Sequence, residues 1–218
     1  MWYGWNIFRY TADMCHLISS ILLLSKMFSK RSCAGISLQT HILYLIVFLT
    51  RYVNSEFFDP PIYNVIFKIF YISSTILTII LILTRFNKTY NKKHDSFRII
   101  WILLICILAT ALSTRDYSLI ELNWTFSLWT EAFAILPQLF LLQRTQRVDV
   151  MTHKYIFFLG LYRLFYIINW VYKTINAKRN RTPYVMWITG IIQTLLYADF
   201  IYYYIKAIIY GKEFELPR

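Results

Sequence analysis

The sequence is poor in charged residues and in cysteine. Charged residues make up 16% of its 218 residues, whereas hydrophobic residues make up 58% and aromatic residues 19%. Together with a mean hydropathy of +0.47, this composition excludes an ordinary soluble domain and is typical of a chain buried in lipid. The three cysteines, Cys15, Cys33 and Cys106, show no CxxC spacing, so neither a zinc site nor a disulfide framework is predicted.

The sequence also lacks the motifs on which most enzymes depend. It contains no nucleophile with a paired base, no metal-ligand spacing and no glycine-rich phosphate loop, so we predict no enzyme, no metal and no cofactor. Lysine and arginine number 23 against 11 acidic residues, a formal net charge of +12. Because no basic soluble domain is left to carry nucleic acid, this charge mainly indicates membrane topology, and no nucleic-acid partner is predicted.

Long apolar stretches account for most of the chain. Seven of them approach the length that crosses a hydrocarbon core of about 30 Å, and they lie at residues 6–24, 36–53, 62–84, 99–114, 118–142, 155–173 and 184–209. We therefore predict an all-α membrane protein in which residues 1–218 form a single seven-helix transmembrane domain. The opening residues lack a basic region and a cleavage site, so the first stretch is expected to be a retained helix.

Basic residues concentrate on one side of the predicted membrane. They fill the connections near residues 26–31, 85–98 and 144–154 and the C-terminal segment, whereas the other side holds fewer of them. The positive-inside rule then places the N-terminus in the lumen or exterior and a short C-terminal tail in the cytosol. The basic loop at residues 178–181 is an exception on the lumenal side.

A faint internal repeat relates the two halves of the chain. The segment that begins at His16 can be laid without a gap on the segment that begins at Glu131, and a slightly shorter offset aligns Arg51 with Arg163. Two three-helix units joined by a linking fourth helix would explain this pattern, and such repeats hold their ligand at the interface between halves. Chance similarity between apolar helices is the alternative.

Three arginines, Arg9, Arg51 and Arg163, fall inside predicted spans, where an arginine costs roughly 2.5–3.5 kcal/mol. Polar residues recur at helical spacing beside them, and Arg9 shares a face with Asp13 and His16. Two further stripes are Glu121, Trp124, Leu128 and Glu131, and then Tyr162, Tyr166, Asn169 and Lys173, flanked by Trp170. Such faces are unstable against lipid, so we expect them to point toward one another or toward water.

The residues alone leave three interpretations of these charges open. In a purely structural network, four acids neutralise four bases: Asp13, Glu121, Glu131 and Asp199 against Arg9, Arg51, Arg163 and Lys68. Alternatively, Arg9 and Arg51 lie toward the lumenal ends, and arginine is suited to bidentate recognition of a carboxylate, which favours an acidic lumenal ligand. A transporter of an anionic or polar solute is the third possibility.

Collinear segments over nearly the whole chain resemble the KDEL receptors, which retrieve escaped endoplasmic-reticulum (ER) proteins from the Golgi. These segments are FRYTADMCHL, SKRSCAGIS, TRY, NKKHDSFR, ELNWTFS, AILPQLF, FFLGLYRLFYIINW and QTLLYADFIYYYI. The resemblance implies the seven-helix fold of the SWEET sugar transporters and PQ-loop proteins, with Pro137 and Gln138 at the corresponding place. It also implies residence in ER and Golgi membranes. A SWEET-like transporter of a small polar or anionic solute remains the alternative.

The resemblance implies a ligand and a role for most of the polar residues. The ligand would be a C-terminal tetrapeptide of the Lys/His-Asp-Glu-Leu type on an ER lumenal protein. Its terminal carboxylate would be received by Arg51, Tyr52 and Tyr162. Arg9 would hold an acidic side chain, while Glu121 and Trp124 would meet the residue fourth from the terminus. The remaining wall of the site would be Arg163, Tyr166, Asn169 and Trp170, with Lys173 near its mouth.

Capture in the acidic Golgi and release in the ER require a pH-sensitive group. The unperturbed pKa of histidine, near 6.5, lies between the two compartments. The resemblance places His16 against Tyr162 and gives Glu131 a part in the switch. One extra proton bound with the ligand would change affinity at most about tenfold per pH unit. A buried neutral histidine that fixes two helices is the alternative.

Several residues depart from the family pattern. Asn54 stands where an aspartate is usual, which predicts a weaker preference for a cation at the residue fourth from the cargo terminus. Lys173 replaces an arginine and loses the planar fork that binds a carboxylate at two points. Of the tail lysines that recruit the COPI coat, Lys212 is retained and Lys206 is shifted by one position, so altered coat recruitment is expected.

Overall fold

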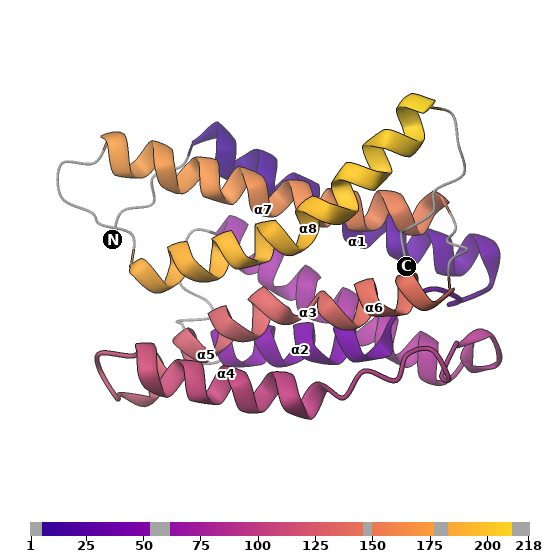
Figure 1. Ribbon diagram of the computed structural model, residues 1–218, viewed down its shortest axis with the longest axis horizontal. Helices are drawn as coiled ribbons and strands as arrows, with labels where there is room; N and C mark the ends of the chain where they lie inside the picture. Colours follow the sequence, from indigo (N-terminus) through magenta and orange to yellow (C-terminus); the bar gives the residue numbers. More distant parts are fainter. Residues whose placement is uncertain (1–5, 53–61, 146–149, 177–182, 211–218) are drawn as a thin grey trace. The chain divides into compact units, whose positions relative to one another are not determined.

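The computed structural model describes residues 6–52, 62–145, 150–176 and 183–210, and in these ranges every regular element is helical (Figure 1). The α-helices are α1 (Ile7–Lys30), α2 (Leu38–Tyr52), α3 (Ile62–Leu83), α4 (Ile99–Ser113), α5 (Leu119–Phe133), α6 (Leu136–Thr145), α7 (Val150–Asn176) and α8 (Tyr184–Tyr210). A short 3-10 helix, η1 (Asn87–Thr89), lies between α3 and α4. The prediction of an all-α protein is confirmed for this part of the chain.

Each predicted stretch contains a helix, but the stretch at residues 118–142 is interrupted. α5 ends at Phe133 and α6 begins at Leu136, which places Pro137 in the first turn of α6. Proline has no N–H to donate to the carbonyl four residues earlier, and it is well tolerated only in the first turn of a helix. At the end of α5, the Ala134 N–H binds the Glu131 carbonyl, three residues earlier, at 3.4 Å. The break therefore falls where the proline requires it.

Five helical segments in the described ranges are long and apolar enough to cross a membrane: α1, α3, α5 with α6, α7 and α8. Of the remaining two, α4 is an apolar helix of 15 residues and α2 also has 15 residues. A helix of that size is about 22 Å long, less than the hydrocarbon core of about 30 Å. The count of seven spans, the lumenal N-terminus and the cytosolic C-terminus therefore stay predictions.

The surface of α4 indicates what surrounds these helices. Its buried residues, Ile102, Cys106 and Thr110, follow one another at helical spacing, and α4 packs against α5. The rest of α4 exposes large apolar side chains, including Leu108 at 61% and Leu112 at 79% exposure. A helix that is apolar on its outer face as well is unfavourable in water and suits hydrocarbon.

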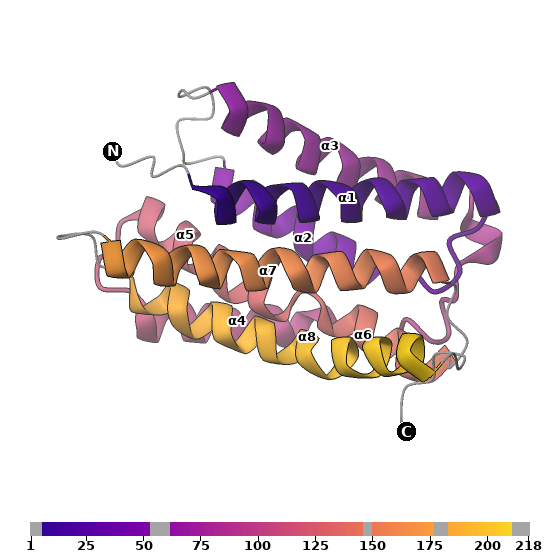
Figure 2. The ribbon, with the colours of Figure 1, turned by 90° about the horizontal axis from the view of Figure 1, so that it is seen from above.

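The chain divides into two compact units, which are described separately. Unit 1 comprises residues 1–26 and 147–218, and unit 2 comprises residues 27–146. In unit 1, α7 and α8 run alongside each other (Figure 2) and approach closely at Gly190, where a Cβ would lie 2.5 Å from Cζ3 of Trp170. The predicted repeats, three helices on either side of a linking helix, follow a different division and stay a prediction.

A buried carboxylate ties the α3–α4 connection to the start of α2 within unit 2. Asp95 accepts hydrogen bonds from the Ser37 hydroxyl at 2.7 Å, the Leu38 N–H at 2.8 Å and the Tyr90 hydroxyl at 2.6 Å. Burial, together with this carboxylate, raises the pKa of Tyr90. The first N–H groups of α2 are thereby satisfied by an anion, which the helix dipole favours.

Gln138 anchors the same region from α6. Its side-chain amide donates to the Gly35 carbonyl at 2.8 Å and accepts from the Ser37 N–H at 2.8 Å, and its own N–H donates to the Thr40 hydroxyl at 2.9 Å. Gln138 is fully buried, so these bonds replace the water that its amide would otherwise need. α2 therefore starts from a fixed point, and Arg51 lies at its other end.

Candidate functional site

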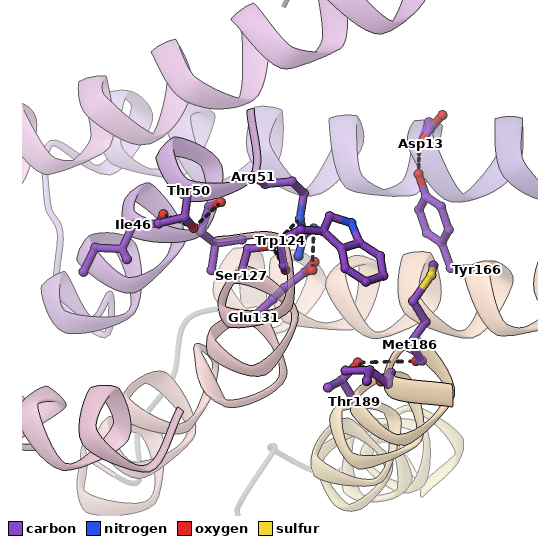
Figure 3. Close-up of polar contacts among 12 residues, drawn as sticks. Asp13, Ile46, Thr50, Arg51, Trp124, Ser127, Glu131, Tyr166, Met186 and Thr189 are labelled. Carbon is purple, nitrogen blue, oxygen red and sulfur yellow. Dashed lines mark hydrogen bonds and ion pairs between the residues drawn. The ribbon is translucent and has the colours of Figure 1, made fainter. Parts of the chain in front are cut away.

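The polar stripes of α1 and α7 face each other within unit 1. Asn6 donates to Asn169 Oδ1 at 2.7 Å, and the Tyr166 hydroxyl donates to Asp13 Oδ1 at 2.5 Å (Figure 3). Helical spacing predicted the residues of each stripe, and the structure brings the two stripes together. We define the α1–α7 polar group as Asn6, Arg9, Asp13, His16, Tyr162, Arg163, Tyr166, Asn169, Trp170 and Lys173.

The His16 ring lies against an aromatic face. It stacks on the ring of Tyr162 with centroids 4.6 Å apart and an interplanar angle of 15°. Tyr162 is buried, and the Arg163 guanidinium carbon lies 5.2 Å from its ring centroid. The Tyr162 ring therefore lies close to both an imidazole and a guanidinium, each of which can interact with an aromatic face.

Basic side chains outnumber acidic ones in the α1–α7 polar group. Its three bases are Arg9, Arg163 and Lys173, whereas Asp13 is its one acid. Arg9 Nε lies 3.9 Å from Asp13 Oδ2, a loose ion pair, and the charge of Arg9 also acts on Lys173. The side chain of Asp199 lies outside the described residues and is not counted in the group. The residues that are counted carry more positive than negative charge. An anionic partner would offset this excess inside a membrane.

Trp170 is held from several sides. It is 6% exposed, and its ring lies 6.4 Å from that of Tyr166 and 5.9 Å from that of Trp187 by centroid. Gly190 on α8 leaves room for the indole, because a side chain there would overlap it. The position of this predicted wall residue is therefore set by α8 as well as by α7.

A second polar cluster lies between α2 and α5 in unit 2. Arg51, in the last turn of α2, places Nη1 2.6 Å from Glu131 Oε2 and donates from Nε to Ser127 Oγ at 3.0 Å (Figure 3). Ser127 and Glu131 are four residues apart on α5 and therefore share a face. We define the α2–α5 polar group as Arg51, Tyr52, Glu121, Trp124, Ser127 and Glu131.

The guanidinium of Arg51 is only partly engaged. Its Nη2 atom is buried and has no hydrogen-bond partner among the described residues. Arg51 pairs with Glu131 and Arg9 pairs with Asp13, as in the purely structural network that was one of the three interpretations of the sequence. These two arginines are thus neutralised in part, while Arg51 keeps a donor for a further acceptor.

The other members of the α2–α5 polar group lie on the same two helices. Tyr52 stacks on Phe48 with centroids 5.8 Å apart, and Lys68 Nζ lies 5.5 Å from the Tyr52 ring centroid. Glu121 lies in the first turn of α5, which Ser118 caps by accepting from the Glu121 N–H at 3.3 Å. An acidic residue in the first turn is favoured by the helix dipole.

Some predicted residues have no described geometry. Asn54, Lys212 and the basic loop at residues 178–181 lie outside the described residues. Lys206 is exposed on α8, with Nζ 5.8 Å from the ring centroid of Tyr202.

Two residues of the polar groups were missed from the sequence. Asn6 accepts the Arg9 N–H at 3.0 Å, and its place three residues before Arg9 is the spacing of a helix cap. Ser127 stands one turn before Glu131, and that spacing is the signal that could have added it to the stripe.

The fold and these two groups define a helical membrane protein with arginines in both of its polar groups. A model of the family described as "ER lumen protein retaining receptor" matches residues 32–173. ER lumen protein-retaining receptors of Entamoeba histolytica, Petunia hybrida and Drosophila melanogaster are 45%, 43% and 39% identical to this chain, and each alignment covers 97% of the chain and 99% of the relative. The chain belongs to the ER lumen protein-retaining receptor family, which confirms the family predicted from its motifs.

Proposed function

We propose that this receptor binds the C-terminal tetrapeptide of escaped ER lumenal proteins, of the Lys/His-Asp-Glu-Leu type. The supporting observation is the state of Arg51, whose guanidinium is anchored through Nε and Nη1 while Nη2 is buried without a hydrogen-bond partner among the described residues. A planar cation with a donor to spare is suited to a carboxylate.

In the α2–α5 polar group, Arg51 receives the terminal carboxylate of the peptide, with Tyr52 beside it. Glu121 and Trp124 contact the residue fourth from the terminus, where a carboxylate and an indole both attract a cation. Asn54 modifies this preference, because it carries no charge where the family usually has an aspartate.

In the α1–α7 polar group, Arg9 holds an acidic side chain of the peptide. Its loose pairing with Asp13, at 3.9 Å, is compatible with a change of partner. The remaining residues form the wall of the site: Tyr162, Arg163, Tyr166, Asn169, Trp170 and Lys173. The excess of positive charge in this group supports an anionic ligand, because an anion reduces the repulsion among its bases.

Binding is coupled to pH through His16, Tyr162 and Glu131. A proton on His16 is stabilised by the Tyr162 face and by the negative charge that the peptide brings. A proton on Glu131 frees Arg51 for the peptide carboxylate. Both protons are taken up with the ligand, so affinity rises as pH falls. Capture is thus favoured in the acidic Golgi and release in the ER.

The loaded receptor then returns to the ER by COPI-dependent retrograde transport. Lys206, exposed on α8, and Lys212 form the cytosolic signal for the coat. The receptor accordingly cycles between ER and Golgi membranes with its N-terminus in the lumen.

A peptide-binding experiment tests this function. The full chain, in lipid nanodiscs, is titrated with Lys-Asp-Glu-Leu bearing either a free or an amidated C-terminus, at pH about 6 and about 7.2. We expect tight binding of the free peptide alone and a preference for the lower pH, which is limited to about fifteenfold for each coupled proton over that interval. Indifference to the carboxylate and to pH would contradict the proposal.

A further inference from the structure

Ser127 stands between Arg51 and the backbone of its own helix. It is fully buried, its hydroxyl donates to the Trp124 carbonyl at 2.6 Å, and the same oxygen accepts from Arg51 Nε at 3.0 Å. A serine hydroxyl has one proton and two lone pairs. Because the proton is committed to the Trp124 carbonyl, the lone pairs are left to face the guanidinium.

This arrangement fixes the plane of the guanidinium. Glu131 contacts Nη1, and a single contact at one end leaves a long, flexible arginine free to turn about it. The second contact, at Nε, lies on a different edge of the same rigid group. Two anchor points on one planar group define its orientation, and with it the direction in which Nη2 points.

We propose that Ser127 is a positioning residue for ligand binding, which sets the guanidinium of Arg51 in the plane that a peptide carboxylate requires. The proposal rests on the proposed function, in which Arg51 receives that carboxylate. Without the Ser127 oxygen, Arg51 keeps its charge and its pair with Glu131, but the orientation of Nη2 is no longer set. Ser127→Ala should weaken binding about tenfold, the effect of losing one charge-assisted hydrogen bond.

A double-mutant cycle isolates this role from a general effect on folding. Lysine has no Nε, so Ser127 has nothing to position in an Arg51→Lys background. We would titrate the full chain in lipid nanodiscs with free and amidated Lys-Asp-Glu-Leu, using Ser127→Ala, Arg51→Lys and the double variant. Thr125→Val is the matched control, because it removes another buried hydroxyl from α5.

Ser127→Ala is expected to lower affinity for the free peptide about tenfold, and by less than about twofold in the Arg51→Lys background. The amidated peptide should not respond, and Thr125→Val should stay within about twofold of the wild type. If Ser127→Ala unfolds, Ser127→Cys, whose sulfur is a weaker acceptor, should show the same dependence on background.

Two results would overturn the inference and leave the proposed function intact. The first is wild-type affinity for Ser127→Ala, or for Ser127→Cys, while Arg51→Lys binds weakly. The second is an equal loss in both backgrounds. A wild-type receptor that binds the amidated peptide as tightly as the free one would instead remove the proposed function itself.

Discussion

Replacing Glu131 by glutamine should separate the contact of this carboxylate with Arg51 from the role in ligand release that we propose for it. Glutamine keeps the shape of the side chain and can still accept a hydrogen bond from the guanidinium, but it carries no charge. In the wild-type protein, Nη1 of Arg51 lies 2.6 Å from Glu131 Oε2. A peptide carboxylate on Nη2 therefore places two carboxylates on one guanidinium.

The size of this conflict follows from the charges. Two unit charges about 5 Å apart interact by about 3 kcal/mol at an effective dielectric constant of 20. That repulsion is relieved when Glu131 takes up a proton, which links binding to acid. In Glu131→Gln the conflict is absent at every pH. We expect affinity at pH about 7.2 to rise by about three- to tenfold, and the ratio of affinities between pH about 6 and about 7.2 to shrink at least about threefold.

Whereas affinity should rise in Glu131→Gln, the free energy of unfolding should fall. Removing one partner of a buried ion pair costs about 3–5 kcal/mol, and the cost is smaller here because the glutamine still accepts a hydrogen bond. The Arg51 side chain is also 21% exposed to solvent, so water screens part of its charge. A loss of about 2 kcal/mol in the free energy of unfolding is expected, measured by tryptophan fluorescence during denaturation.

The assay is titration of the full chain with the free tetrapeptide at both pH values. Glu121→Gln serves as the matched control, because it removes a carboxylate from the first turn of the same helix. It should change the preference at the fourth residue and leave the pH ratio as it is. An unchanged pH ratio and an unchanged neutral affinity in Glu131→Gln would refute the reasoning.

Three further predictions concern other parts of the chain. Gly190→Ala should displace the Trp170 indole, because the added Cβ would lie 2.5 Å from Cζ3; we expect a lower unfolding temperature and several-fold weaker peptide binding, and wild-type values of both would contradict the packing argument. His16→Leu should reduce the ratio of affinities between pH about 6 and about 7.2 at least about threefold relative to the wild type, and an unchanged ratio would exclude His16 from the switch. Asp95→Asn should destabilise the fold by about 2 kcal/mol and bring the titration of Tyr90 closer to its ordinary range in ultraviolet absorbance; a Tyr90 titration that does not move would contradict the raised pKa.

Helical periodicity explains how much of the α1–α7 polar group the sequence could predict. Arg9, Asp13 and His16 share a face because of their spacing, and a face with three polar residues must avoid lipid. The same argument applied to α7 selected Tyr162 and Tyr166. The structure brings these faces together, since His16 stacks on Tyr162 and Asp13 accepts from Tyr166.

Partners far apart in the chain could not be predicted in this way. Four acids and four bases allowed many pairings, and spacing alone did not select Glu131 as the partner of Arg51. Ser127 was missed because a serine inside an apolar helix most often binds its own backbone, and its second bond, to a residue 76 positions away, depends on the packing of α2 against α5. The break before Pro137 was also missed, although its signal is local.

The pairing of Arg51 explains how an arginine can be both tolerated in a membrane protein and available to a ligand. Arg51 lies in the last turn of α2 with one guanidinium nitrogen buried, so its charge needs an internal anion in the resting protein, and Glu131 supplies it. An anion that held the guanidinium on every edge would exclude a ligand. Here Ser127 and Glu131 contact Nε and Nη1 and leave Nη2, so in the proposed function the residues that stabilise the empty receptor also define where the peptide carboxylate binds. In the proposed function, acid favours the bound state by removing the charge of Glu131, the internal anion that becomes unnecessary once the peptide supplies its own.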